Sequence, residues 1–311
     1  MKKKEIRKKI SSIGARLALN FSFWLVRISP YWLFQGVMQV FAFVWFHSAK
    51  RLRKVAWETL TVAFGETKGP QELEAIIHQC FRNITHAMLD LAYYSQHPQK
   101  VQERFIIENR HYLDAALQKG KGVVLVTAHF GNFPLMMLNL AQMGYRPSVI
   151  LRRARDPEIA KKIYQVMERV GVKTIYSVPP RESVKQSLES LRANEILCVL
   201  MDQNFGSGSG VFVEFFGRKA ATATGPVVFA ERTGADVLLA FTVQEEGKYR
   251  VIFEPPVKLE EREDQQERLT VNVAKITRII EDYIRRYPAE WGWMHRRWKS
   301  QDATAEQGVS L

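Results

Sequence analysis

The chain has 311 residues, of which 46% are hydrophobic, and it contains neither repeats nor low-complexity tracts. These properties exclude a repeat protein and a disordered chain, and they favour one α/β domain with a helical N-terminal annex. The net charge of +13 attracts polyanions such as nucleic acid, anionic lipid headgroups or an acidic carrier protein. Cys80 and Cys198 lie far apart in apolar runs, so we expect buried free thiols and neither a disulfide framework nor a zinc site.

The N-terminal region combines basic and apolar segments. After the basic stretch MKKKEIRKK, polar residues recur at helical spacing along one side of residues 10–29, which is typical of a helix lying in a membrane interface. Residues 28–46 carry no charge, but at roughly 1.5 Å per residue they barely span a bilayer core of about 30 Å. We favour a monotopic or re-entrant anchor. A membrane span and a buried core helix are the alternatives.

The rest of the chain predicts an α/β fold. Apolar residues at three- and four-residue spacing predict helices over 50–118. The predicted strands after that are Val123–Thr127, Pro147–Leu151, Lys173–Tyr176, Ile196–Met201, Val237–Val243 and Tyr249–Phe253. The predicted helices cover 134–143, 156–170, 181–193, 225–233 and 265–287. We expect a central, mostly parallel or mixed sheet flanked by helices. The predicted parts are a membrane-associating helical segment over 1–50 and one α/β domain over 51–311.

The stretch VVLVTAHFGNFPLMMLNL, residues 123–140, places one histidine where a buried strand ends and a helix begins. In such sheets, functional groups gather at the carboxyl ends of strands. Asn132 suits the N-cap of the helix and Pro134 its first turn. The helix dipole disfavours the imidazolium, so His129 is expected to be neutral near pH 7 and able to accept a proton. A structural histidine that bonds a nearby carbonyl is the alternative.

Four motifs resemble a known family. They are TAHFGNF at 127–133, LRRARDP at 151–157, the block from Asp202 to Pro226, and YPAEWGWMHRRWK at 287–299. Together they resemble the lauroyl/myristoyl acyltransferases of lipid A biosynthesis, within the lysophospholipid acyltransferase superfamily. They are also similar to the phosphatidylinositol mannoside acyltransferases.

The resemblance implies a membrane-associated O-acyltransferase. Such an enzyme moves a fatty acyl chain from an acyl carrier protein or coenzyme A thioester to a hydroxyl of a glycolipid, such as a lipid A precursor. The thioester is a co-substrate, and neither a cofactor nor a metal is implied. The implied location is the cytoplasmic side of the inner membrane, with anionic lipids as partners.

The family pattern places Asp or Glu five positions after the histidine, where this chain has Pro134. That carboxylate would hold the second ring nitrogen and stabilise the imidazolium that forms when His129 takes a proton. Asp202, which ends an apolar strand, and Glu214, in FVEFFGR, are the candidate replacements. Otherwise His129 acts unaided, or the site is inactive.

The resemblance also implies an oxyanion partner. Arg152 matches the arginine of the family's R-x4-P stretch and is expected to stabilise the tetrahedral oxyanion, although Arg153 is adjacent. Backbone N–H groups around Gly131 are an alternative. FGSGSG, residues 205–210, lacks the pattern of a P-loop and is interpreted as an active-site loop. In WMHRRW we expect structural packing together with electrostatic attraction to the membrane, and specific binding of an acidic headgroup is the alternative.

The sequence bears on three other functions. A lysophosphatidate acyltransferase would carry a motif like FPEGTRS, which this chain lacks. A catalytically silent lipid-binding or scaffold protein is supported by Pro134. Nucleic-acid binding rests on net charge alone and is disfavoured, because the basic residues flank apolar stretches and form no basic and aromatic binding motif.

Overall fold

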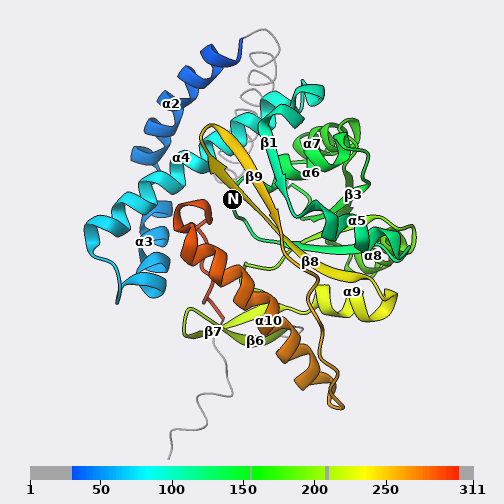
Figure 1. Ribbon diagram of the computed structural model, residues 1–311. Coiled ribbons are helices and arrows are strands. Elements are labelled where there is room, and N and C mark those ends of the chain that lie inside the picture. The colour runs from blue at the N-terminus through cyan, green and yellow to red at the C-terminus, as the bar shows by residue number, and fades with distance from the viewer. Residues whose placement is uncertain (1–29, 155, 207–209, 301–311) are drawn as a thin grey trace, which may run out of the picture.

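A computed structural model describes residues 30–154, 156–206 and 210–300. The basic helix predicted within residues 1–29 and the centre of the 205–210 loop lie outside the described residues. A seven-stranded sheet forms the centre of the fold, in the order β1-β9-β8-β2-β5-β3-β4 (Figure 1). Neighbouring strands are parallel except β8 and β9, which are antiparallel. The predicted α/β class with a mostly parallel, mixed sheet is therefore confirmed.

All six predicted strands are present, and three of them have the predicted bounds. The strands of the large sheet are β1 (Phe105–Glu108), β2 (Val123–Thr127), β3 (Pro147–Leu151), β4 (Lys173–Tyr176), β5 (Ile196–Leu200), β8 (Asp236–Glu245) and β9 (Lys248–Phe253). A separate antiparallel hairpin consists of β6 (Gly210–Phe215) and β7 (Arg218–Ala223).

Helices cover both faces of the sheet. They are α5 (Arg110–Gln118), α6 (Phe133–Gln142), α7 (Pro157–Arg169), α8 (Pro180–Arg192), α9 (Gly225–Thr233) and α10 (Gln265–Arg286). Alternate strand residues point to opposite faces. Accordingly, Val124 and Val126 join a hydrophobic cluster with α8, α9 and α10, whereas Val123 and Leu125 join a second cluster with α5 and α6. The central strand β2 is buried throughout.

Three N-terminal helices gather on one side of the sheet: α2 (Tyr31–Ser48), α3 (Lys50–Phe64) and α4 (Pro70–Tyr94) (Figure 1). The first half of α4 packs into one hydrophobic cluster through Leu73 and Ile77. Its end packs into the other cluster through Tyr93. The helix α4 therefore contacts both hydrophobic clusters, one on each face of the sheet.

The two sides of α2 differ in burial. Phe34, Ala42 and Phe46 are buried, and Phe46 packs edge-on against Phe81 of α4. The other side exposes large hydrophobic residues, namely Trp32, Leu33, Val37, Val40, Phe41, Phe43 and Val44. The alternative prediction that residues 28–46 form a buried core helix therefore fits only one side of α2. Within the described ranges, the helices lack the combination of length and apolar character that crossing a bilayer requires.

Two parts of the sheet structure differ from the sequence prediction. The helical prediction for 50–118 is wrong at Phe105–Glu108, because these residues form β1 and pair with β9 at the edge of the sheet. The β6–β7 hairpin was not predicted. By contrast, Cys80 and Cys198 are buried free thiols, as expected.

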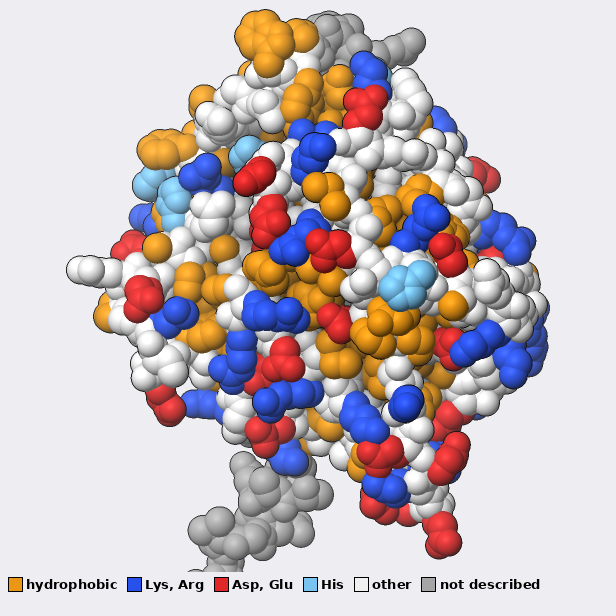
Figure 2. All heavy atoms as spheres, viewed as in Figure 1, with side chains coloured by type: hydrophobic (Ala, Val, Ile, Leu, Met, Phe, Trp, Pro, Cys, Tyr) orange, Lys and Arg blue, Asp and Glu red, His pale blue; other side chains and the backbone are white. Residues whose placement is uncertain are grey.

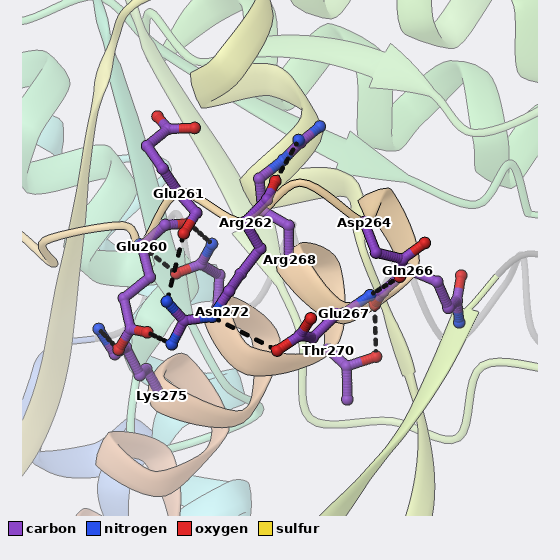
Figure 3. Close-up of polar contacts among 10 residues, drawn as sticks. All are labelled: Glu260, Glu261, Arg262, Asp264, Gln266, Glu267, Arg268, Thr270, Asn272 and Lys275. Atoms are coloured by element: carbon purple, nitrogen blue, oxygen red, sulfur yellow. Dashed lines mark hydrogen bonds and ion pairs between the residues drawn. The ribbon is translucent and has the colours of Figure 1, made fainter.

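Polar contacts fasten the connector after β9 to α10 (Figure 3). Asp264 caps α10 by accepting a hydrogen bond from the backbone N–H of Glu267 at 2.6 Å. The buried amide of Asn272 accepts from the N–H of Glu260 at 2.7 Å and donates to the carbonyl of Glu260 at 2.9 Å. These contacts fix the start of α10, the helix that leads into the 288–298 segment.

Candidate active site

Adjacent parallel strands bring His129 and Asp202 together. In the register of β2 and β5, Thr127 lies opposite Leu200. Each functional residue follows its strand by two positions, so the chain places His129 opposite Asp202 at the carboxyl edge of the sheet. The imidazole Nδ1 of His129 lies 3.0 Å from Oδ1 of Asp202. The backbone N–H of His129 donates to Oδ2 of the same carboxylate at 2.9 Å.

The 288–298 segment supports this pair from the other side. Phe130 and Trp291 form an antiparallel β-bridge, and the N–H of Gly292 donates to the carbonyl of His129 at 2.9 Å. The fully buried indole of Trp291 donates to Oδ2 of Asp202 at 2.8 Å. The Asp202 carboxylate therefore accepts three hydrogen bonds, and such bonds favour its ionised form.

The charges of the pair shift both pKa values. Burial is the largest influence on His129 and alone lowers its pKa, but the charge and hydrogen bond of Asp202 together outweigh burial and raise it. The net shift is opposite in direction to the one expected from the helix dipole alone. Burial alone raises the pKa of Asp202, but the attraction and hydrogen bonds of His129 hold it well below its usual range.

The geometry also defines the tautomer of His129. Because the ionised Asp202 accepts at Oδ1, the proton of the neutral imidazole lies on Nδ1 of His129. The Nε2 atom then keeps its lone pair and can accept a proton. The ring is partly open to solvent, with 38% of the side chain exposed.

A pocket of about 350 Å³ opens beside this ring. Its apolar lining comes from one face of α4, the first turn of α6 and the 288–298 segment, and comprises Ile84, Ala87, Met88, Leu91, Phe133, Pro134 and Met294. The α4 members follow the i, i+3, i+4, i+7 spacing that places residues on one side of a helix. Asn132, Gln203 and His295 are the polar side chains that line the pocket alongside His129.

The other predicted site residues lie elsewhere. Glu214 of β6 faces Lys219 across the hairpin and lines a different pocket, together with Lys275 and Glu281 of α10. Arg152 is exposed in the loop after β3, two strands away from β2 in the sheet order. Neither lines the pocket around His129, as far as the described residues define it.

The backbone alternative for the oxyanion partner is wrong for Gly131. Its N–H donates to the carbonyl of Glu290 at 2.8 Å, so this donor is already used to hold the loop. Asn132 caps α6 as predicted, since its side chain accepts from the N–H of Leu135 at 3.2 Å.

Sequence reasoning missed three residues of this site. Trp291 and Gln203 contact Asp202 and His129, and Arg297 is fully buried behind them. Arg297 donates to the carbonyl oxygens of Ala221 at 2.6 Å and Gln203 at 3.3 Å, and burial lowers its pKa to about 10. The structural interpretation of WMHRRW is therefore confirmed for Arg297. Trp291 and Gln203 stood within recognised motifs, but nothing in their spacing indicated a contact with the histidine.

Comparisons with known proteins match this chain to acyltransferases. A family model described as bacterial lipid A biosynthesis acyltransferase matches residues 1–300. The chain is 26% identical over 259 residues to the lipid A biosynthesis lauroyltransferase of Escherichia coli, covering 81% of this chain and 80% of that protein. It is 25% identical over 198 residues to the phosphatidylinositol mannoside acyltransferase of Mycobacterium tuberculosis, covering 62% of this chain and 60% of that protein.

One solved structure was also compared. The 1-acyl-sn-glycerophosphate acyltransferase of Thermotoga maritima aligns with 76% of this chain and 97% of its own, at 13% identity and a TM-score of 0.36. A likeness of this strength carries no functional argument.

Proposed function

Because the chain belongs to the bacterial lipid A biosynthesis acyltransferase family and is an acyltransferase, we propose that it acylates a hydroxyl of a glycolipid such as a lipid A precursor. The acyl donor in this proposal is a thioester of acyl carrier protein or coenzyme A. One observation carries the proposal: His129 lines a largely apolar pocket while Asp202 holds its Nδ1 at 3.0 Å, which leaves Nε2 of the neutral ring as the proton acceptor.

The proposed chemistry begins with proton transfer. Nε2 of His129 takes the proton of the acceptor hydroxyl as its oxygen attacks the thioester carbonyl carbon. The ionised Asp202 stabilises the imidazolium that results. The tetrahedral intermediate then collapses, the C–S bond breaks, and the leaving thiolate takes the proton from His129. In this role Asp202 replaces the carboxylate that Pro134 displaces from the family position.

The apolar lining from α4 suits the acyl part of the thioester. A fatty acyl chain gains roughly 0.8 kcal/mol for each CH₂ group it removes from water. Met88 is exposed at this face of α4, so the apolar lining continues to the molecular surface. We propose that the donor chain enters there, with its carbonyl carbon held near His129.

The catalytic roles of Arg152 and Glu214 stay predictions, and the position of each residue favours a different role. Strands in a sheet lie about 4.8 Å apart, which puts the end of β3 roughly 10 Å from the end of β2. From that position Arg152 is better suited to bind an anionic part of the acceptor or donor than the oxyanion. Glu214 is better explained as a partner of the basic residues of β7 and α10 than as the missing carboxylate.

The exposed side of α2 supports the proposed location at a membrane. Hydrophobic side chains follow α2 along the upper left edge of the molecule in Figure 2. Lys50, Arg51 and Lys54 follow directly at the start of α3, where they can meet anionic headgroups. We propose that α2 lies in the interface of the inner membrane, on its cytoplasmic side, and presents the pocket to lipid-borne acceptors.

The proposal is tested by acyl transfer from acyl carrier protein or coenzyme A thioesters to a lipid A precursor in mixed micelles. His129→Ala is expected to lower kcat by about 10²–10⁴-fold. Asp202→Asn is expected to lower kcat by at least about 10²-fold, since it keeps the shape but loses the charge. It should also move the acidic limb of the pH profile to lower pH, because Asp202 raises the pKa of His129.

Glu214→Gln is the matched control, since it removes a carboxylate from the neighbouring hairpin, and it should retain the parent activity. Full activity in His129→Ala would contradict the mechanism. Loss of activity in Glu214→Gln, with Asp202→Asn unaffected, would reverse the assignment of the carboxylate. A parent protein without turnover on any lipid hydroxyl would favour a silent scaffold.

A further inference from the structure

The carboxamide of Gln203 lies against the reactive nitrogen of the site. Its Nε2 is 3.2 Å from Nε2 of His129. Since Nδ1 of His129 bears the proton that Asp202 accepts, the His129 Nε2 atom offers a lone pair, and Gln203 donates an N–H to it. An acceptor hydroxyl needs this same lone pair. The amide of Gln203 therefore has to move aside, by a short distance, when the hydroxyl binds.

The structure allows this movement. The side chain of Gln203 is exposed and lines the pocket. Its main chain is held in place, because its carbonyl accepts from the buried guanidinium of Arg297 and the preceding Asp202 is itself buried. The backbone is fixed and the amide is mounted on two rotatable methylene groups, so the N–H groups can swing within the pocket.

Several other hydrogen-bond donors beside the ring are already engaged. The N–H of His129 donates to Asp202, that of Gly131 to Glu290 and that of Gly292 to His129. The side-chain amide of Asn132 donates to the carbonyl of Ala87 at 3.3 Å. These donors hold the loops together. Gln203 differs from them because its acceptor is the atom that the substrate must take.

We propose that Gln203 is a catalytic residue that donates a hydrogen bond to the oxyanion of the tetrahedral intermediate. The inference rests on the proposed acyl transfer. The hydroxyl proton moves to Nε2 of His129, the new C–O bond forms, and the carbonyl π electrons move to the oxygen, where the displaced amide N–H binds them. When the intermediate collapses, the C=O bond re-forms, the C–S bond breaks and the thiolate takes the proton from His129.

The position suits this role. A base must lie about 2.6–3.2 Å from the oxygen that it deprotonates, and an oxyanion donor about 2.7–3.1 Å from the developing charge. The attacking oxygen and the oxyanion are bonded to the same carbon. The amide of Gln203 starts 3.2 Å from the base nitrogen of His129. When the hydroxyl takes its place, the amide is therefore left beside the carbonyl carbon of the thioester.

Three substitutions test the inference, with kcat and KM measured on the full chain by release of the free thiol. Gln203→Met and Gln203→Glu preserve the approximate size but remove both N–H donors, and each is expected to lower kcat by about 10²–10³-fold. The KM for the acyl donor should stay close to the parent value. Gln203→Asn keeps a donor on a shorter arm and should recover part of the lost rate.

Asn204→Ala is the matched control, because this neighbouring amide donates instead to the hydroxyl of Ser300 at 3.1 Å. Thermal unfolding of each variant checks that the fold is intact. Parent-like kcat in Gln203→Met would overturn the inference. The amide would then only bind the His129 nitrogen when no substrate is present. A raised kcat would overturn it too, by identifying the amide as an obstruction.

His129→Ala in the same assay separates the two proposals. If His129→Ala is inactive while Gln203→Met is fully active, the inference fails and the proposed function stands. If His129→Ala is active, the proposed mechanism itself fails. A parent enzyme without turnover would overturn both, because the inference depends on acyl transfer.

Discussion

The indole N–H of Trp291 donates to Oδ2 of Asp202 at 2.8 Å, the oxygen that also accepts from the backbone N–H of His129. Replacing it in Trp291→Phe removes a hydrogen bond to a charged group, an interaction worth about 1.5–3 kcal/mol. We expect kcat/KM at neutral pH to fall by about 10-fold or more. With one donor fewer, Asp202 attracts the imidazolium more strongly, the pKa of His129 rises, and the acidic limb of the pH profile moves to higher pH.

Trp293 offers a matched control for this substitution. It is also fully buried and packs edge-on against Trp291, but its indole donates to the carbonyl of Pro288. Trp293→Phe should make a similar cavity and leave the acidic limb where it is. Equal shifts of the limb in both variants would show that Trp291 acts only through packing.

The site residues differed in how far sequence could place them. His129 and Asp202 could be predicted, because each follows a buried parallel strand by two residues, and neighbouring strand ends meet at one edge. Glu214 was selected by its motif alone, whereas the alternation of β6 places Val213 and Phe215 inward and Glu214 outward. Trp291 could not be predicted, since its position depends on the length and direction of α10.

At the scale of elements, the 288–298 segment contains a half-buried carboxyl group, that of Glu290. Burial raises the pKa of Glu290 to about 7, against smaller opposing hydrogen bonds from the N–H of Gln244 and the amide of Asn83. The folded state therefore keeps a proton that the unfolded chain, with a pKa near 4.5, has already lost. Unfolding releases that proton between these two pKa values, so the free energy of unfolding decreases as pH rises from about 4.5 to 7.

Glu290→Gln is expected to remove this dependence and to raise the free energy of unfolding by about 1–3 kcal/mol at pH 7–8, compared with the parent. Denaturant titrations at several pH values measure the effect. The exposed Glu246→Gln is the control, which should leave the slope between pH 4.5 and 7 unchanged. A parent-like slope in Glu290→Gln would contradict the assignment.

The two elements missed by sequence reasoning were missed for different reasons: β1 pairs with a strand far along the chain, whereas β6 and β7 pair with each other but carry a weak strand signal. The strand β1 has four residues and no clear alternation of burial, and it pairs with β9 more than 140 residues later. The helical spacing of apolar residues on both sides of β1 was stronger than this strand signal, so the segment was predicted as helix. The β6–β7 hairpin lies beside a Gly/Ser-rich stretch that resembles a loop. Long, strongly patterned elements such as α10 and β2 were predicted almost to the residue.

At the scale of the whole molecule, the exposed side of α2 and the pocket lined by α4 belong to neighbouring helices. The double substitution Trp32→Ser and Phe43→Ser removes two large exposed apolar groups. Each such group contributes about 1.5–3 kcal/mol when it leaves water completely. We expect binding to vesicles containing anionic lipid, measured by sedimentation, to weaken at least about 10-fold.

Ile163→Ser combined with Tyr164→Ser is the matched control, because these residues of α7 are also exposed but lie on another helix. This control should bind vesicles like the parent. Added salt should weaken binding of all variants, since the net charge of +13 attracts anionic headgroups. Parent-like binding of the α2 variant would show that another surface contacts the lipid.

The ribosome makes this chain from residue 1 onward, so the contact between Trp291 and Asp202 can form only late in synthesis. His129 and Asp202 emerge early, and their strands can pair while synthesis continues. The indole and the guanidinium of Arg297 that brace them are added almost a hundred residues after Asp202. A nascent chain therefore carries the His129–Asp202 pair without the hydrogen bond from Trp291, which can form only after that residue has been synthesised.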